Sequence, residues 1–585
     1  ITVFSKVFGK PKEFYKKLIN DGVNNICLEK KVTMDKALEL KKTVIDGLFY
    51  EEDFSRMYPY GSLASHVLGY VDREMNGIEG IEKKYHERLI GNDGYYVFER
   101  DVLGRIISVD EKLSKSATAG NNVVLTINKT YQKILEEELA AGLQKYGGES
   151  AVGIIMNPSS GEIFALANLP DFDPANYYLF TDDSRRNRAI TDTYEPGSTM
   201  KSITISILLD QNLAREDEVI DTENGTYLIK NTRITDTHKH SKLTVSEVLE
   251  QSSNIGMAKL SNRVADDVLY KYLRDFGFSN ATEIELPGEA GGFLKKPDSF
   301  SGLTKPFISF GYEISVTPLQ LITAYSALIN GGNLLQPYIV KLLTDYTGRI
   351  LEETKPKKIR TVINKKTSDA IKKMMIGVVE NGTGTAAQLE NVLVGGKTGT
   401  SQRLVDHSYS NSRHNSSFVG FFPADNPNVV CLILINSPEL GKYGGLVAAP
   451  IFREVARRMI ETDLNLVPNK KKIERKQNLI DQLVADIKTA PKAQKNSFAN
   501  LSERPAANFQ TRKIFNGNRT TMPNLVNQSM RDAITQLNEI GMQYKTIGTG
   551  KVVWQSLEPG SNIIPGSVCI IKLESSIKKV SAGAN

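Results

Sequence analysis

One long stretch without a core-forming pattern divides this chain and limits the folds it can adopt. From Leu464 to Thr521 the sequence carries Lys470-Lys471-Lys472, a short helical pattern at 479–487, and then a run rich in Pro, Asn, Ser and Lys. Such a segment buries no core of its own and is typical of a basic, flexible linker. The chain's 585 residues also exceed the size at which a single core stops growing. We therefore predict domains at 1–118, 119–463 and 522–575, a linker at 464–521 and a polar tail at 576–585.

The flanking domains differ in character from the middle one. Residues 1–118 mix charge and polarity, with an amphipathic helix at 35–48 followed by many turn glycines, which favours a loop-rich α+β region. Residues 522–573 predict a small module with a helix from Ser529 to Ile540, for which Ser529 is a plausible N-cap and Gly541 a plausible stop. Two strands at 552–556 and 568–573 follow that helix, with a turn at 558–560.

The middle region alternates strands and helices. It begins with a strand at 123–127, a helix at 131–146 and a hairpin at 151–167. Its last elements are a strand at 429–435 and a helix at 449–461, and a terminal helix that packs back on a sheet would close one domain. The chain is thus predicted to be an α/β multidomain protein.

Composition excludes several kinds of function. The net charge of +6 is small for this length, and no stripe of Lys and Arg with interleaved aromatic residues suggests nucleic-acid binding. Three cysteines far apart predict neither a disulfide framework nor a metal site, and Cys431 is expected in a buried strand. Of the six histidines only His238 and His240 approach a ligand spacing, and a solvated loop explains them better. We expect no metal.

The first candidate for chemistry is a serine at a turn that leads into a helix. In Tyr194-Glu195-Pro196-Gly197-Ser198-Thr199-Met200-Lys201 the Pro-Gly pair marks the turn and an apolar-periodic run follows it. Lys201 lies about one helical turn after Ser198, so an amine can reach the hydroxyl, which needs a base to become a nucleophile. Ser-x-x-Lys also occurs at Ser575 and Ser576 in the polar tail. Taken alone, the motif is better explained as an N-cap beside a surface lysine.

Two further motifs follow in order. Gln251-Ser252-Ser253-Asn254 comes after a helical pattern at 244–250, so Ser252 and Asn254 could point the same way from a short connection between helices. Taken alone, this segment is better explained as a polar helix junction. Residues 394–400 (Val-Gly-Gly-Lys-Thr-Gly-Thr) predict a strand in which alternation puts Lys397 and Gly399 on one face and Thr398 and Thr400 on the other.

Two nucleotide-binding patterns are decoys. The Gly-Lys-Thr at 396–398 would be a phosphate loop only if residue 391 were glycine, and it is Asn391. The run Gly382-Thr383-Gly384-Thr385-Ala386-Ala387 fits a loose dinucleotide pattern, but it follows the helical segment 368–379 rather than a strand. We reject both interpretations.

The ordered set of motifs resembles the active site of penicillin-recognising serine enzymes. Residues 187–198, 311–320 and 417–423 resemble further segments of class B penicillin-binding proteins, residues 58–94 their N-terminal pedestal, and residues 522–573 a PASTA domain. Segment 311–320 and the PASTA-like module look more like the division or spore-type branch. This resemblance implies the penicillin-binding transpeptidase fold, an antiparallel sheet sandwiched by helices, with an α+β pedestal and a C-terminal PASTA domain.

The resemblance also implies roles for the motif residues. Ser198 would attack the carbonyl between two D-alanines of a peptidoglycan stem, with Lys201 as general base and Ser252 as proton relay, while Asn254 would hold Lys201 and a substrate amide. Burial and positive neighbours such as Lys397 would lower the pKa of Lys201. Lys397, Thr398 and Thr400, with Gly399 between them, would bind the terminal carboxylate, and the N–H groups of Ser198 and Thr400 would form the oxyanion hole. No metal or organic cofactor is needed.

Other interpretations remain open at this point. A serine β-lactamase or β-lactam sensor shares the three motifs, but the Ser252-Ser253-Asn254 sequence departs from one lactamase class, and no deacylating Glu-x-x-Leu-Asn loop is evident. A non-catalytic wall-binding scaffold is the second alternative, and the PASTA-like module could bind muropeptide or brace the catalytic domain. The region before the catalytic domain is too short for a glycosyltransferase.

The resemblance further implies a place in the cell. Family members of this kind are single-pass membrane proteins with an extracytoplasmic catalytic part, β-lactams as covalent inhibitors, and membrane glycosyltransferase or divisome partners. No stretch approaches the roughly 18 apolar residues of a membrane helix. Because the chain begins at Ile1 rather than Met, we expect the native anchor to precede it.

Overall fold

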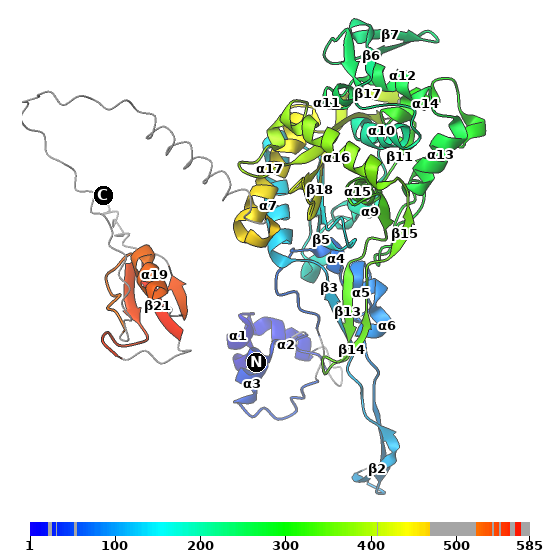
Figure 1. The fold of residues 1–585 in the computed structure, drawn as a ribbon. Coiled ribbons are helices and arrows are strands. Elements are labelled where there is room, and N and C mark those ends of the chain that lie inside the picture. The colour runs from blue at the N-terminus through cyan, green and yellow to red at the C-terminus, as the bar shows by residue number, and fades with distance from the viewer. Residues whose placement is uncertain are drawn as a thin grey trace, which may run out of the picture. The chain divides into compact units, whose positions relative to one another are not determined.

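The structure of the chain is a computed structural model that describes residues 1–20, 26–30, 32–51, 55–103, 105–405, 408–467, 522–540, 543–548, 551–561 and 568–574 (Figure 1). The chain separates into two compact units, Ile1–Lys488 and Thr489–Asn585. Most of the predicted linker, the polar tail and Gly541 lie outside the described residues.

A five-stranded antiparallel sheet forms the centre of the first unit, in the order β16-β17-β18-β4-β5. Its strands are β4 (Ser150–Met156), β5 (Ile163–Leu169), β16 (Gly395–Val405), β17 (Ser408–Phe422) and β18 (Val429–Asn436). The predicted hairpin is the β4–β5 pair, and the predicted strand at 429–435 is β18. Strand β16, which carries the third motif, lies at an edge of the sheet.

Helices cover both faces of this sheet (Figure 1). Helices α7 (Lys129–Tyr146) and α17 (Gly444–Thr462) share one core with Ala151 and Ile155, whereas α10 (Met200–Asp210) and α15 (Pro318–Ile329) share the other with Val152 and Ile154. Neighbouring residues of β4 therefore enter different cores, as strand alternation requires. Because both faces are buried, the strands read as nearly continuous apolar runs. The predicted sandwich is confirmed, and Cys431 is buried in it as expected.

Helix termini follow from local chemistry. Helix α7 begins two residues before its predicted start because the Asn128 side chain accepts hydrogen bonds from the N–H groups of Thr130 and Tyr131. Helix α17 begins at Gly444, five residues before the prediction, since two glycines conceal its start. The other helices of this region are α8 (Asp182–Arg185), α9 (Arg188–Thr191), α11 (Val245–Glu250), α12 (Asn254–Ser261), α13 (Asp266–Asp275), α14 (Thr304–Ser309) and α16 (Lys365–Glu380).

Short strands complete the region. Strand β3 (Asn122–Leu125) pairs with β13 (Val340–Thr344), which also pairs with β14 (Ile350–Glu353). The remaining pairs are β6 (Val219–Asp221) with β9 (Lys242–Thr244), β7 (Thr226–Ile229) with β8 (Thr232–Thr235), β10 (Phe293–Leu294) with β11 (Ile314–Ser315), and β12 (Asn333–Leu335) with β15 (Lys358–Thr361).

The N-terminal region contains several small pieces. Helices α1 (Thr2–Phe8), α2 (Lys12–Asn20) and α3 (Met34–Lys41) enclose Phe4, Tyr15 and Leu40. Helix α3 ends well before the predicted position 48 because Thr43-Val44-Ile45 is β-branched and Gly47 has φ 77°. Beyond it lie α4 (Ser65–Leu68), α5 (Gly80–Lys84), α6 (His86–Leu89) and a hairpin of β1 (Tyr95–Arg100) and β2 (Ile106–Lys115).

The second unit contains a small module with its own core. Helix α19 (Met530–Glu539) packs with β19 (Gln543–Gly548), β20 (Lys551–Gln555) and β21 (Val568–Glu574), in the sheet order β19-β21-β20. The predicted N-cap is confirmed, since Ser529 Oγ accepts from Asp532 N at 3.2 Å. Strand β19 was not predicted. Within the described residues no helix combines the length and apolarity needed to cross a membrane.

Candidate active site

Ser198 lies in a single 3-10 turn, Gly197–Thr199, that runs directly into α10. Gly197 has φ 58°, and a Cβ there would lie 2.5 Å from the carbonyl oxygen of Thr400 on β16. On its other side, Gly197 N donates to Gly311 O at 3.1 Å. The serine turn is therefore held between β16 and Gly311, and only glycine permits the close approach. The predicted position of Ser198 at a helix start is confirmed.

Buried side chains fix this turn from both ends. Ser401 Oγ donates to Glu195 O at 2.6 Å, and Tyr325 OH of α15 donates to Thr199 O at 2.7 Å. Thr199 Oγ1 also donates to Pro196 O at 2.8 Å. Ser198 itself stays half-exposed, and no hydrogen bond of its Oγ is recorded among the described residues. The nucleophile candidate is thus accessible on a rigid support.

Lys201 is fully buried and points to the second motif. Its Nζ donates to Ser252 O at 2.5 Å, to Ser252 Oγ at 3.1 Å and to Asn254 Oδ1 at 2.7 Å. Ser252 joins α11 to α12 with φ 58°, so the predicted short connection between helices is confirmed. Ser252 and Asn254 do point the same way, toward Lys201.

Lys397 on β16 completes the cluster. It is also fully buried, and its Nζ donates to Ser252 Oγ at 3.1 Å and lies 3.3 Å from Thr398 Oγ1. The Ser252 hydroxyl therefore contacts both lysines. The motifs at 198–201, 252–254 and 397–400, distant in sequence, meet at this one point.

The hydroxyls of the two β16 threonines contact residues of other elements. Thr398 Oγ1 lies 2.8 Å from Thr383 Oγ1, and Thr400 Oγ1 accepts from Gly444 N at 3.0 Å. A Cβ on Gly399 would lie 2.9 Å from Thr199 Cγ2 and 2.2 Å from Ser417 Oγ, so this residue faces the serine turn and leaves no room for a side chain.

Burial lowers the pKa of both lysines. It lowers the pKa of Lys201 to about 7, against the opposing effect of the negative charge of Asp236. Burial, together with the charge of Lys201, lowers the pKa of Lys397 well below its usual value. Burial therefore acts on Lys201 as predicted, whereas the influence between the two lysines is seen on Lys397. At neutral pH a large fraction of Lys201 is a neutral amine that can accept a proton.

Two side chains of the site were missed by the sequence interpretation. Asp236 follows β8 and accepts hydrogen bonds from Ser253 Oγ, Asn254 N and Ile255 N. Thr383 belongs to the run rejected as a dinucleotide motif, and its hydroxyl contacts that of Thr398. Neither residue stands in a spacing that marks a site, so only the fold brings them in.

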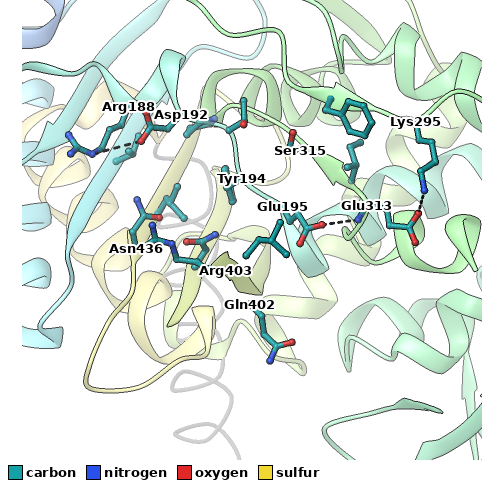
Figure 2. Close-up of a pocket in the computed structure, with 18 residues that line it drawn as sticks. Arg188, Asp192, Tyr194, Glu195, Lys295, Glu313, Ser315, Gln402, Arg403 and Asn436 are labelled. Carbon is teal, nitrogen blue, oxygen red and sulfur yellow. Dashed lines mark hydrogen bonds and ion pairs between the residues drawn. The ribbon is translucent and has the colours of Figure 1, made fainter. Parts of the chain in front are cut away.

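A cavity of about 510 Å³ lies beside the segment that precedes Ser198 (Figure 2). Glu195 Oε1 accepts there from Glu313 N at 2.9 Å and from Tyr409 OH at 3.0 Å, and Lys295 pairs with Glu313 at 2.8 Å. Of the described residues that line it, none is a motif serine or lysine. The cavity is thus distinct from the cluster, and Glu195 ties the serine turn to its neighbours.

A serine at a helix start, a buried lysine one turn later, a Ser-x-Asn turn and a Lys-Thr-Gly strand define a penicillin-recognising serine enzyme. Comparisons agree. The "Penicillin binding protein transpeptidase domain" family matches residues 151–457, the "Penicillin-binding Protein dimerisation domain" family residues 1–125, and the "PASTA domain" family residues 520–575. The chain belongs to the penicillin-binding protein transpeptidases, and the predicted resemblance to their class B members is confirmed.

Relatives span most of the chain. Stage V sporulation protein D of Bacillus subtilis is 36% identical over 76% of this chain and 70% of its own length. Peptidoglycan D,D-transpeptidase FtsI of Escherichia coli is 31% identical over 76% of this chain and 73% of its own. The crystal structure of penicillin-binding protein 3 from Mycobacterium tuberculosis complexed with aztreonam matches with TM-score 0.64 and 29% identity, over 71% of this chain and 92% of that one.

Proposed function

We propose that this chain is a serine D,D-transpeptidase that cross-links peptidoglycan stem peptides through an acyl-enzyme on Ser198. One observation carries the assignment of roles: the Ser252 hydroxyl accepts hydrogen bonds from both buried lysines, at 3.1 Å each. A hydroxyl held between two amines of lowered pKa can pass a proton in either direction. Such an arrangement serves a reaction in which a serine proton is first removed and then delivered to a leaving amine.

In the acylation step Lys201, as the neutral amine, takes the proton of Ser198 while Oγ bonds to the carbonyl carbon between two D-alanines. The C–N bond then breaks, and the leaving D-alanine receives a proton through Ser252. The N–H groups of Ser198 and Thr400 stabilise the tetrahedral oxyanion, each by about 3 kcal/mol in the barrier. The contact between Gly197 and the Thr400 backbone supports this pairing.

In the second step an amine of a neighbouring stem attacks the ester. The new C–N bond forms, the C–Oγ bond breaks, and the amine proton returns to Ser198 by way of Lys201. Asn254 orients Lys201 through its 2.7 Å hydrogen bond and is positioned to hold a substrate amide. No metal or organic cofactor takes part in either step.

The substrate carboxylate binds at β16. Lys397, Thr398 and Thr400 would supply one ammonium and two hydroxyls to that carboxylate, with Gly399 between the two threonines. Thr400 is half-exposed, as are Ser198, Ser252 and Asn254, so these four form the accessible side of the site. β-Lactams carry an amide and a carboxylate in similar positions and would acylate Ser198.

The finer assignments belong to the same proposal. We place the pedestal at 1–118, the transpeptidase domain at 119–463 and the PASTA domain at 522–575, joined by the linker 464–521. We assign the chain to the division or spore-type branch, and the name of one relative, a sporulation protein, supports the second of these roles. On this view the native protein is held in the cell membrane by a single span, with its catalytic part outside and glycosyltransferase or divisome partners beside it.

Intact-mass measurement after incubation with penicillin tests the proposal. The expected result is one long-lived adduct, mapped to the peptide that contains Ser198 and absent from Ser198→Ala. Rapid hydrolysis of penicillin without accumulation of the adduct would instead favour the β-lactamase alternative. A Ser198→Ala variant that fully sustains wall synthesis in the cell would favour the scaffold.

A further inference from the structure

A carboxylate behind the Ser-x-Asn turn holds that turn in place. Asp236 Oδ1 accepts from Asn254 N at 2.6 Å and from Ile255 N at 3.1 Å, and Asp236 Oδ2 accepts from Ser253 Oγ at 2.5 Å. Ser253 Oγ in turn accepts from Gly256 N at 2.9 Å. The first three N–H groups of α12, which have no partner inside the helix, are thus all satisfied.

These bonds bear directly on the catalytic geometry. Ser252 and Asn254, which flank Ser253, supply all three recorded acceptors of Lys201. Ser252 also has φ 58°, a backbone conformation that a residue with a side chain adopts only when its surroundings impose it. Asp236 therefore fastens the turn at the place where it must hold the lysine.

We propose that Asp236 is a positioning residue of the transpeptidase, because its hydrogen bonds fix the Ser252–Asn254 turn that holds Lys201. This inference rests on the proposed function. Among the described residues, the charged groups that act on Lys201 or are acted on by it are Asp236, from the segment after β8, and Lys397 of β16. The side chains of the turn itself, Ser252 and Asn254, are neutral.

The charge of Asp236 acts against burial. Burial lowers the pKa of Lys201 to about 7, and the negative charge of Asp236 raises it, so without that charge the pKa would be lower still. A base of lower pKa is unprotonated at lower pH, but it is also a weaker proton acceptor. Catalysis is therefore most efficient when the pKa of the base lies near the working pH. Asp236 thereby keeps Lys201 close to that optimum.

The test is the pH dependence of acylation by a fluorescent penicillin between about pH 5.5 and 9. In the wild type the second-order rate constant should rise with pH as Lys201 loses its proton. Asp236→Asn keeps the shape of the side chain and an acceptor for the two N–H groups but removes the charge. The acidic limb of the profile, where the rate constant rises with pH, should therefore move to lower pH by about one pH unit. The plateau, the limiting rate constant at high pH, should fall. Asp217→Asn, at a side chain 83% exposed in the exposed pair with Arg215, is the matched control and should leave the profile unchanged.

Two further variants separate charge from structure. Asp236→Glu and Ser253→Ala keep the carboxylate charge and should lower the plateau without moving the limb. The inference is overturned if Asp236→Asn leaves the limb in place, or if Ser253→Ala moves it as far. A wild type that penicillin does not acylate would contradict the proposed function itself, a different outcome from an unshifted Asp236→Asn profile.

Discussion

At the scale of single residues, the site contains two fully buried lysines, and neither has an ion-pair partner among the residues that the structure describes. The recorded acceptors of Lys201 and Lys397 are hydroxyls, carbonyl oxygens and an amide oxygen. Taking an ammonium from water to such a place is unfavourable, which is why burial lowers both pKa values. The reactivity of the site and its thermodynamic cost therefore have the same origin.

Replacing Lys397 with methionine should show this cost as a pH-dependent stability. The folded-state pKa of each lysine lies below 10.5, the value expected in the unfolded chain, so the unfolded chain binds more protons. The free energy of unfolding of the wild type therefore rises with pH between the folded-state and the unfolded-state pKa. Lys397→Met should thus melt at a higher temperature than the wild type near pH 7, and the difference should close as the pH rises toward 10. Calorimetry at several pH values measures the difference in melting temperature, and Lys133→Met, at an exposed side chain, is the control. A gap that does not change with pH would contradict the explanation.

Ser252 allows chemistry and backbone strain to be separated. Both Ser252→Ala and Ser252→Gly remove the hydroxyl between the lysines, so acylation by penicillin should slow by roughly 10²–10³-fold in each. Only glycine relieves the left-handed φ, and Ser252→Gly should be more stable than Ser252→Ala by roughly 1 kcal/mol. Denaturant unfolding alongside acylation rates checks both parts. Equal stability of the two variants would show that φ 58° carries no strain here.

The sequence alone predicts the residues of this site that belong to a recognisable short motif, and it does not predict those that lie outside such motifs. Ser198, Lys201, Ser252, Asn254 and Lys397 were predicted because three motifs occur in order. In the structure hydrogen bonds join the last four, and Ser198 lies in the turn directly before the helix that carries Lys201. The roles given to them remain predictions. Asp236 follows Ile234-Thr235 on a short strand whose local pattern shows nothing of α12, so the contact exists only in three dimensions.

At the scale of elements, the serine turn depends on the closeness of β16. Gly197→Ala would place a Cβ 2.5 Å from the Thr400 carbonyl oxygen at φ 58°, so the turn must move away from the strand. Acylation should fall by about 10²-fold or more, the size expected when an oxyanion donor is displaced. Gly291→Ala, at a position with nothing within 4 Å, is the control and should acylate normally. A normal rate in Gly197→Ala would argue against the proposed oxyanion hole.

The predicted helix and strand positions were wrong in two places, one with a local cause and one that depends on tertiary contacts. Helix α3 ends before a β-branched run, which the prediction from amphipathic periodicity did not take into account. Strand β19 was passed over because Gln543 to Gly548 is largely polar, and it becomes a strand by pairing in parallel with β21. By contrast β18 and the β4–β5 hairpin, which are largely apolar, were predicted almost to the residue.

At the scale of the whole molecule, the C-terminal module has its own core. Met522, Leu525, Leu537 and Val552 pack with Cys569 and Ile571, and these residues belong to the second compact unit. A chain ended after Val467 should therefore keep the wild-type acylation rate and the melting transition of the first unit. Stopped-flow acylation and calorimetry on both chains make the comparison. A lower melting temperature would instead favour a bracing role for the module.

The left-handed backbone at Ser252 has a consequence for laboratory evolution. A library enriched only for survival of heating would prefer glycine to other replacements of Ser252, since only glycine relieves the left-handed φ. Such variants would lack the hydroxyl that contacts both lysines, so the selected population would be acylated more slowly by β-lactams. Any programme of thermal improvement on this scaffold should therefore couple each round of selection to covalent labelling.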